Sequence, residues 1–70
     1  MSLQTGIAQL HEAMRHLRQA ADRAKMYWTD AVQQEFEKRY LQPLELIVRR
    51  TLEEMQRLDE ALRQMQRDCS

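Results

Sequence analysis

The feature that most constrains this chain is a pair of apolar stripes with heptad spacing, interrupted at Trp28-Thr29-Asp30. In the first stripe, apolar residues recur at alternating steps of three and four, the spacing that gathers them on one face of an α-helix. The members are Ile7, Leu10, Met14, Leu17, Ala21, Ala24 and Trp28. This spacing predicts a first helix over about residues 3–27, with an apolar face that needs a partner helix.

The interruption predicts that the chain reverses at residues 28–30. Thr29 and Asp30 are both typical N-cap residues, and Asp30 with Gln33 three positions later has the pattern of a capping box. A second helix is therefore expected from about residue 31, antiparallel to the first. The alternative is one continuous helix, because nothing in the segment forbids helical backbone.

The second stripe changes face along its length. Its early members, Val32, Phe36 and Tyr40, share one face, and we expect them to pack inside the hairpin, with Trp28 closing against them. From Leu41 onward the heptad spacing resumes on an offset face. Between residues 40 and 48 apolar side chains point around most of the helix, which is typical of a segment buried on more than one side.

Pro43 lies inside this second helical pattern. A proline within a helix removes one hydrogen bond and clashes with the carbonyl one turn earlier, at a cost of about 3 kcal/mol. Two outcomes are open: a bend at Pro43, or a third helical segment that begins there. Because the apolar spacing continues across the proline, we favour one kinked helix over about residues 31–68.

The two predicted helices differ in length, so the second must project beyond the first. At 1.5 Å per residue they span about 37 and 57 Å, and pairing ends near Met55. The stripe beyond it, which ends near Cys69, would be exposed unless a second chain covers it, and a two-fold dimer forming a four-helix bundle is the simplest cover. The residues assigned to this oligomer interface are Leu41, Leu44, Ile47, Val48, Met55, Leu58, Leu62 and Met65.

Length and charge narrow the class of protein. Seventy residues make one domain, 1–70, whose core alone supplies little stability, and a single cysteine cannot form an internal disulfide. The 11 basic and 11 acidic side chains cancel, which argues against a dedicated nucleic-acid or membrane-surface binder. Without a basic leader or a long apolar run, we expect a cytoplasmic chain, with export without a cleaved signal as the alternative.

The sequence predicts no catalytic, cofactor or metal site. His11 and His16 are five positions apart, about 140° around a helix, whereas a zinc-protease motif needs histidines four apart on one face. Cys69 near the C-terminus is interpreted as a terminal thiol. No nucleophile–base pattern or glycine-rich phosphate loop is present, so we expect a protein without enzymatic activity and without a small-molecule ligand.

A heptad helix, a Trp-x-polar turn and an aromatic residue eight positions after the tryptophan resemble the Trp-x-Gly superfamily of small helical-hairpin proteins. The residues that carry the resemblance are Trp28-Thr29-Asp30 and Phe36, within residues 7–65, and Asp30 stands where the family has glycine. The resemblance implies a hairpin that dimerises into a four-helix bundle. It also implies a role in type VII (early secretory antigen-like) secretion, as an exported effector, carrier or adaptor.

The sequence therefore predicts an all-α protein that works as a protein–protein interaction module, paired with itself or with a related helical chain. Two alternatives remain open at this point. One is a small nucleic-acid-associated regulator, and the other is an accessory subunit of a larger complex.

Overall fold

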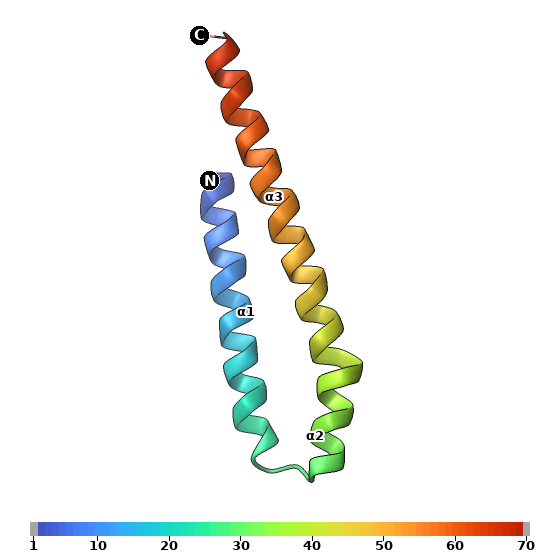
Figure 1. Ribbon diagram of the computed structural model, residues 1–70. Coiled ribbons are helices and arrows are strands. Elements are labelled where there is room, and N and C mark those ends of the chain that lie inside the picture. Colours follow the sequence, from blue (N-terminus) through green and yellow to red (C-terminus); the bar gives the residue numbers. More distant parts are fainter. Residues whose placement is uncertain (1, 70) are drawn as a thin grey trace.

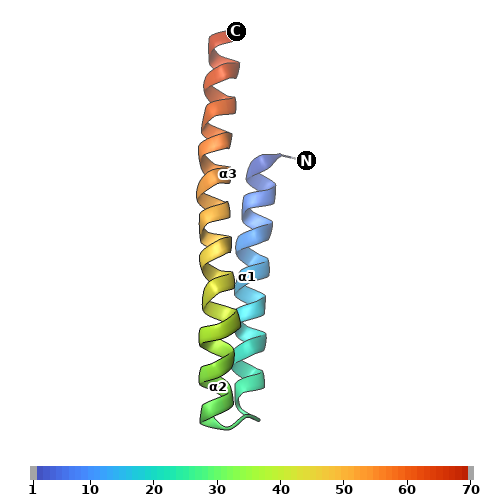
Figure 2. The same cartoon turned by 90° about the vertical axis from the view of Figure 1, so that its right-hand side faces the viewer.

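The computed structural model describes residues 2–69, which form a long helical hairpin with dimensions of 59 × 18 × 10 Å. Helix α1 spans Leu3–Lys25, and after a turn the chain returns through α2 (Asp30–Phe36), the π-helical segment η1 (Glu37–Leu41) and α3 (Gln42–Cys69). The last three elements follow one another without a break and are here called the second arm. Figure 1 shows α1 and the second arm running antiparallel, with α3 extending beyond the N-terminus of α1, and Figure 2 shows the same overhang from the side. The predicted all-helical hairpin with a longer second arm is confirmed.

The turn begins earlier than predicted. Helix α1 ends at Lys25. Each of the next three backbone N–H groups donates to the carbonyl three residues back, and the last of these bonds runs from the N–H of Trp28 to the carbonyl of Lys25. These bonds tighten the last turn of α1 and satisfy carbonyls that would otherwise lack a partner. The described residues include none with positive φ, so the reversal needs no glycine.

The predicted capping box between Asp30 and Gln33 is wrong. Thr29 is the N-cap of α2, and its hydroxyl accepts a hydrogen bond from the backbone N–H of Val32. The Gln33 side-chain amide instead donates to the carbonyl oxygens of Lys25 and Trp28, at 2.7 and 3.1 Å. Gln33 therefore ties the start of α2 to the end of α1 and fixes the reversal from within the second arm.

The π-helical segment directly precedes Pro43. The N–H of Gln42 donates to the carbonyl of Glu37, five residues back, where an α-helix would use a residue four back. Proline has no N–H to offer and its ring crowds the preceding turn, so a wider turn at this position accommodates it. The predicted single long helix is thus confirmed as a continuous arm, with a π-helical join in place of a simple bend.

The π segment also explains why the second stripe changes face. One extra residue in a turn rotates everything before it by about 100° relative to everything after it. This rotation brings Phe36 into line with the later α1-facing residues. In a regular α-helix, Phe36 and Leu41, which are five positions apart, would point to different sides. The side chains of the second arm that are buried or half-buried are Gln33, Phe36, Glu37, Leu41, Glu45, Val48, Leu52, Met55 and Asp59.

The hairpin core is small. Ala21, Leu41 and Leu52 are its buried apolar side chains, and Leu41 is only 1% exposed. Helices α1 and α3 also approach each other closely at the open end of the hairpin. A β-carbon added to Gly6 would lie 3.5 Å from the Cε of Met55. A core of this size leaves most apolar side chains of the chain in partial contact with water.

Candidate interaction surface

The turn end is closed by aromatic packing. The rings of Trp28 and Phe36 meet edge to face with centroids 5.1 Å apart, as the sequence predicted, and Phe36 contacts Tyr40 at 6.1 Å. The guanidinium of Arg39 lies 6.0 Å from the centre of the Tyr40 ring. Trp28 therefore fixes the place where the two arms meet.

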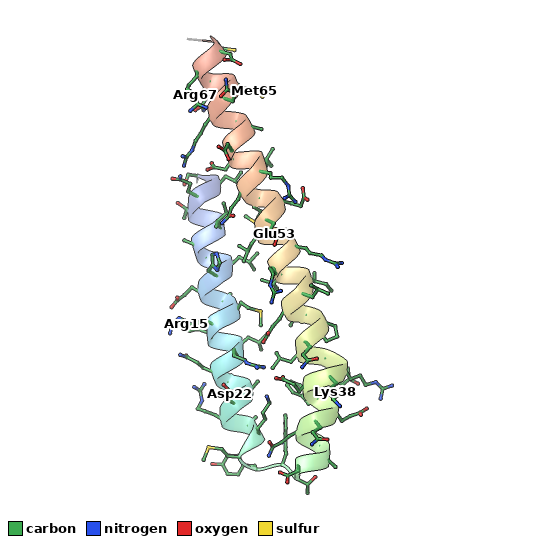
Figure 3. All side chains as sticks on the ribbon, in the orientation of Figure 1. Arg15, Asp22, Lys38, Glu53, Met65 and Arg67 are labelled. Atoms are coloured by element: carbon green, nitrogen blue, oxygen red, sulfur yellow. The ribbon has the colours of Figure 1, made fainter. Side chains whose placement is uncertain are left out.

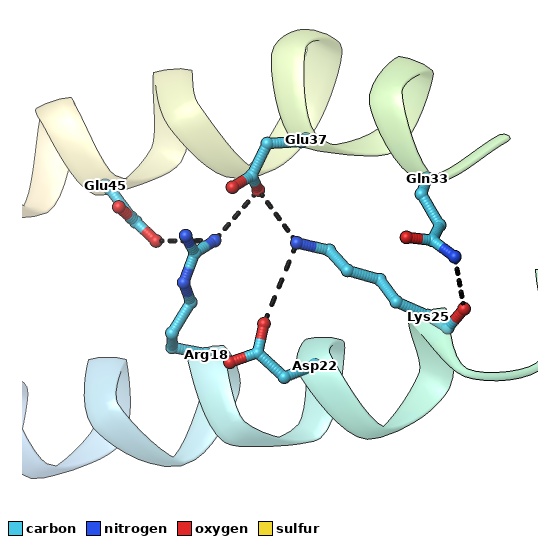
Figure 4. Close-up of polar contacts among 6 residues, drawn as sticks. All are labelled: Arg18, Asp22, Lys25, Gln33, Glu37 and Glu45. Carbon is cyan, nitrogen blue, oxygen red and sulfur yellow. Dashed lines mark hydrogen bonds and ion pairs between the residues drawn. The ribbon is translucent and has the colours of Figure 1, made fainter. Parts of the chain in front are cut away.

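One face of the hairpin is held by ion pairs between α1 and the second arm. Arg18 lies 2.8 Å from Glu37 and 3.3 Å from Glu45, and the Nζ of Lys25 lies 3.3 Å from Glu37 (Figure 4). Lys25 also reaches Asp22 at 3.7 Å. Five charged side chains thus form one connected network that bridges the two arms, and we call this side the polar face.

Glu37 is the centre of that network. The guanidinium of Arg18, hydrogen-bonded to its carboxylate, lowers the pKa of Glu37 below its ordinary value of 4.5, and Lys25 adds to the effect. The same hydrogen bond raises the pKa of Arg18. Because folding lowers the pKa of Glu37, its stabilising contribution is present above pH 4.5 and is lost as the pH falls through the folded-state pKa.

We expect Glu37→Gln to lower the free energy of unfolding at pH 7 by less than about 1 kcal/mol, because these groups are partly exposed to water. The difference from wild type should shrink as the pH is lowered below 4.5, since both proteins then lack the Glu37 charge. Thermal unfolding followed by circular dichroism at one protein concentration measures both values. Glu53→Gln, which removes an exposed carboxylate from the same arm, is the control. An E37Q difference that stays constant down to pH 3 would contradict the assignment.

An open groove lies between α1 and α3 on the polar face. Two of its guanidinium groups are paired, Arg15 with Glu12 and Arg18 with Glu45, and His16 lies outside the groove, 3.1 Å from Glu12. Within residues 2–69, no group of three or more His, Cys, Asp or Glu side chains could hold a metal ion. The groove is lined by His11, Met14, Arg15, Arg18, Glu45, Val48, Arg49 and Leu52.

The opposite face of the hairpin is apolar. Arg18 pairs with Glu45 across the hairpin, and Leu17 and Leu44 are the residues just before them in sequence. One step back along a right-handed helix turns a side chain by about 100°, and because the two helices are antiparallel, both leucines turn to the same side of the hairpin, away from the ion pairs. Further along α3, exposed apolar residues fall within about 60° of Leu44 around the helix. We call this surface the apolar face, and its exposed residues are Leu17, Val32, Tyr40, Leu44, Ile47, Leu58, Leu62 and Met65.

Three residues were assigned to the wrong side of the hairpin. Leu41, predicted in the oligomer interface, is the most buried side chain of the hairpin core. Val32 and Tyr40, predicted inside the hairpin, are 48% and 58% exposed and lie on the apolar face. The rotation introduced by η1 causes the errors at Leu41 and Tyr40, because it brings Leu41 into line with Phe36 and turns Tyr40 away from α1. Val32 lies before η1, in the regular helix α2, where Gln33 and Phe36 are the half-buried residues.

The other predicted stripe residues lie close to where the spacing put them. Ile7, Leu10, Met14 and Ala24 are half-buried against the second arm, whereas Leu17 is partly exposed. Val48 and Met55 are the exceptions: predicted to face a second chain, they are half-buried in the contact between α1 and α3, where Val48 lines the groove and Met55 lies against Gly6. Leu52, which was not assigned to either predicted stripe, is buried and completes the α1-facing line.

The C-terminal end of α3 is not covered by α1, as the unequal lengths of the two predicted helices require. Helix α1 begins at Leu3, and every described residue after Asp59 is exposed. Met65 and Arg67 lie on the part of α3 beyond the N-terminus of α1 (Figure 3). The exposed side chains of Leu58, Leu62 and Met65 continue the apolar face along this arm.

The chain exposes more surface than a globular protein of its size. Its accessible surface is 5748 Å², whereas a folded monomer of 8.5 kDa exposes about 4,700 Å². Its radius of gyration is 16.9 Å, against about 11 Å for a globular chain of 70 residues. The excess of roughly 1,000 Å² is similar to the surface, about 800 Å², that each partner buries in a standard protein–protein interface.

No protein family, curated protein or solved structure matches this chain. The resemblance to the Trp-x-Gly superfamily therefore stays a prediction that rests on the turn residues and Phe36. None of the helices formed by residues 2–69 has the length and apolar character needed to cross a membrane.

Proposed function

We propose that this chain is a non-enzymatic assembly module that pairs with a second copy of itself through the apolar face, giving a four-helix bundle. The observation that carries the proposal is the excess surface of roughly 1,000 Å² together with its location. Eight of the eleven large apolar residues that are exposed within residues 2–69 lie on the apolar face, and ion pairs occupy the opposite face. An exposed apolar face rimmed by polar residues is typical of a protein–protein interface.

The physical basis of the pairing is removal of apolar surface from water. Each leucine moved from water into an interface contributes roughly 1.5–3 kcal/mol before the cost of association is subtracted. Four leucines of the apolar face, Leu17, Leu44, Leu58 and Leu62, are between 39% and 53% exposed in the single chain. Their burial would stabilise a hairpin whose own core holds only three buried residues.

The small residues of α1 support close packing of a second hairpin. Ala13 and Ala20 are exposed and lie beside Leu17 on the side away from Arg18. Short side chains let a neighbouring helix approach the backbone, so the partner would contact α1 as well as α3. The interface would therefore involve both arms of each hairpin, which is the arrangement of a four-helix bundle.

Sedimentation equilibrium of the purified chain between 1 and 100 µM tests the proposal. We expect a mass of twice 8.5 kDa at the upper end of this range, with helix content rising or constant as the dimer forms. A fully helical chain that stays monomeric at 100 µM would overturn self-association. Dimerisation only after addition of a different chain would assign the apolar face to a hetero-partner and would also overturn it.

A further inference from the structure

One line of apolar residues along the second arm, which includes Tyr40, Leu44, Leu58 and Leu62 of the apolar face, is spaced symmetrically about Thr51. Ile47 and Met55 lie four residues from it, and Leu44 and Leu58 lie seven residues from it. Tyr40 and Leu62 follow at eleven residues on either side. A stripe that reads the same in both directions is complementary to an antiparallel copy of itself, because each apolar residue on one side of Thr51 then lies level with the apolar residue at the same distance on the other side of Thr51 in the second copy.

The π segment extends this symmetry to the ends of the arm. Phe36 is fifteen residues from Thr51 in sequence. Because η1 holds one extra residue, Phe36 lies at the height and angle that a residue fourteen positions from Thr51 would have in a regular helix. Met65 is fourteen residues from Thr51 on the other side. The midpoint of the second arm, which runs from Asp30 to Cys69, is near residue 50, so an antiparallel copy centred on Thr51 overlaps it along its whole length.

From this spacing we infer that two copies pack antiparallel, α3 against α3, with the two-fold axis passing beside Thr51. The inference rests on the proposed self-association and adds its geometry. In this arrangement the uncovered end of each α3 lies beside the turn end of its partner. Leu62 then meets Tyr40 of the second copy, and Leu58 meets Leu44, so the exposed residues at the two ends of the hairpin cover one another.

Thr51 suits the position on the axis. It is the polar side chain at the centre of an otherwise apolar line, and it meets its own copy there. Its hydroxyl donates to the carbonyl of Ile47 in the same helix, at 2.8 Å, so the donor is already satisfied. Burial of Thr51 at the dimer centre therefore leaves no hydrogen-bond donor without a partner, and its methyl group is free to pack.

A parallel arrangement would use the same face less well. The two free ends of α3, after Asp59, would then extend side by side as an isolated pair of about ten residues each. Each free end would then be covered by one neighbouring helix alone. The exposed residues at the turn end would also meet only themselves. The antiparallel arrangement instead supports each free end of α3 on a folded hairpin.

Disulfide cross-linking of single-cysteine variants tests the geometry. In a Cys69→Ser background, Thr51→Cys places two thiols beside the axis, whereas Leu62→Cys places its two thiols about 33 Å apart, from twice eleven residues at 1.5 Å. Under mild oxidation we expect T51C to form a covalent dimer nearly completely and L62C to form little. A mixture of L62C with Tyr40→Cys should cross-link between the two different chains.

The outcomes separate the two proposals. If L62C cross-links to itself as efficiently as T51C, the copies are parallel and the antiparallel inference is wrong, although self-association stands. If sedimentation shows a dimer but neither T51C nor the L62C–Y40C mixture cross-links, the contact lies elsewhere and the inference also fails. Circular dichroism of each variant shows whether it is folded, and cross-linking in urea gives the background from random collision. A monomer by sedimentation would instead overturn the proposed function itself.

Discussion

Replacing Leu41 by alanine should lower the free energy of unfolding more than truncating any exposed leucine of the chain. The side chain is 1% exposed, and truncating a buried leucine costs about 2–5 kcal/mol. A chain of 70 residues has a total stability of roughly 3–10 kcal/mol, so this single change removes a large share of it. Leu41 is also the last residue of the π segment.

Leu46→Ala is the matched control, because it truncates the same residue type in the same helix at a side chain that is 41% exposed. We expect it to change the unfolding free energy by less than about 1 kcal/mol. Urea unfolding followed by circular dichroism at 222 nm, at equal protein concentration, compares the two variants. Equal losses for Leu41→Ala and Leu46→Ala would mean that the core described around Leu41 does not exist in solution.

Leu62→Asp should separate association from folding. Leu62 is 43% exposed in the hairpin, so an aspartate there remains hydrated in the single chain. In the proposed dimer the same carboxylate would be removed from water twice, once in each copy, against the ring of Tyr40. We expect the dimer dissociation constant to rise at least about 100-fold, which corresponds to roughly 3 kcal/mol.

Leu46→Asp again serves as the control, because Leu46 has nearly the same exposure, 41%, but lies away from the apolar face on the same helix. Sedimentation equilibrium of both variants gives the two dissociation constants directly. If Leu46→Asp weakens the dimer as much as Leu62→Asp, the interface is not the apolar face. If neither variant changes the dimer, the second copy does not contact α3 at Leu62.

Heptad spacing predicted much of this fold. The alternating steps of three and four from Ile7 to Trp28 predicted most of the residues of α1 that contact the second arm. The polar pair Thr29-Asp30 predicted the position of the chain reversal to within about two residues. The overhang followed from the unequal lengths of the two stripes. These features were readable because each depends on local periodicity or on residues next to one another in sequence.

The errors have one main physical origin. Periodicity at 100° per residue assumes a constant helical repeat, and η1 breaks that repeat between Phe36 and Leu41. Every assignment that crossed the π segment was therefore rotated, which is why Leu41 and Tyr40 exchanged roles. Two signals were present in the sequence, the proline and the change of face, but neither specifies by itself that the extra residue lies before Pro43.

Long-range polar contacts were also beyond sequence reasoning. Arg18, Glu37 and Glu45 are three of 22 charged residues in the chain, and nothing in their spacing says which charged residues will meet across the hairpin. The role of Gln33 was missed for a similar reason, since its partners are backbone carbonyls that lie close only after the chain has reversed. Such contacts depend on the register between the two arms, which the packing of the apolar side chains sets.

The rod shape of the hairpin has a practical consequence for counting chains. A particle 59 Å long and 18 Å wide diffuses more slowly than a sphere of equal mass, so on gel filtration it elutes ahead of its true size. An antiparallel pair of such rods would be thicker but hardly longer, and its elution volume would differ little from that of the single chain. Column elution alone would therefore misjudge the stoichiometry, whereas methods that weigh the particle, such as light scattering or sedimentation equilibrium, would not.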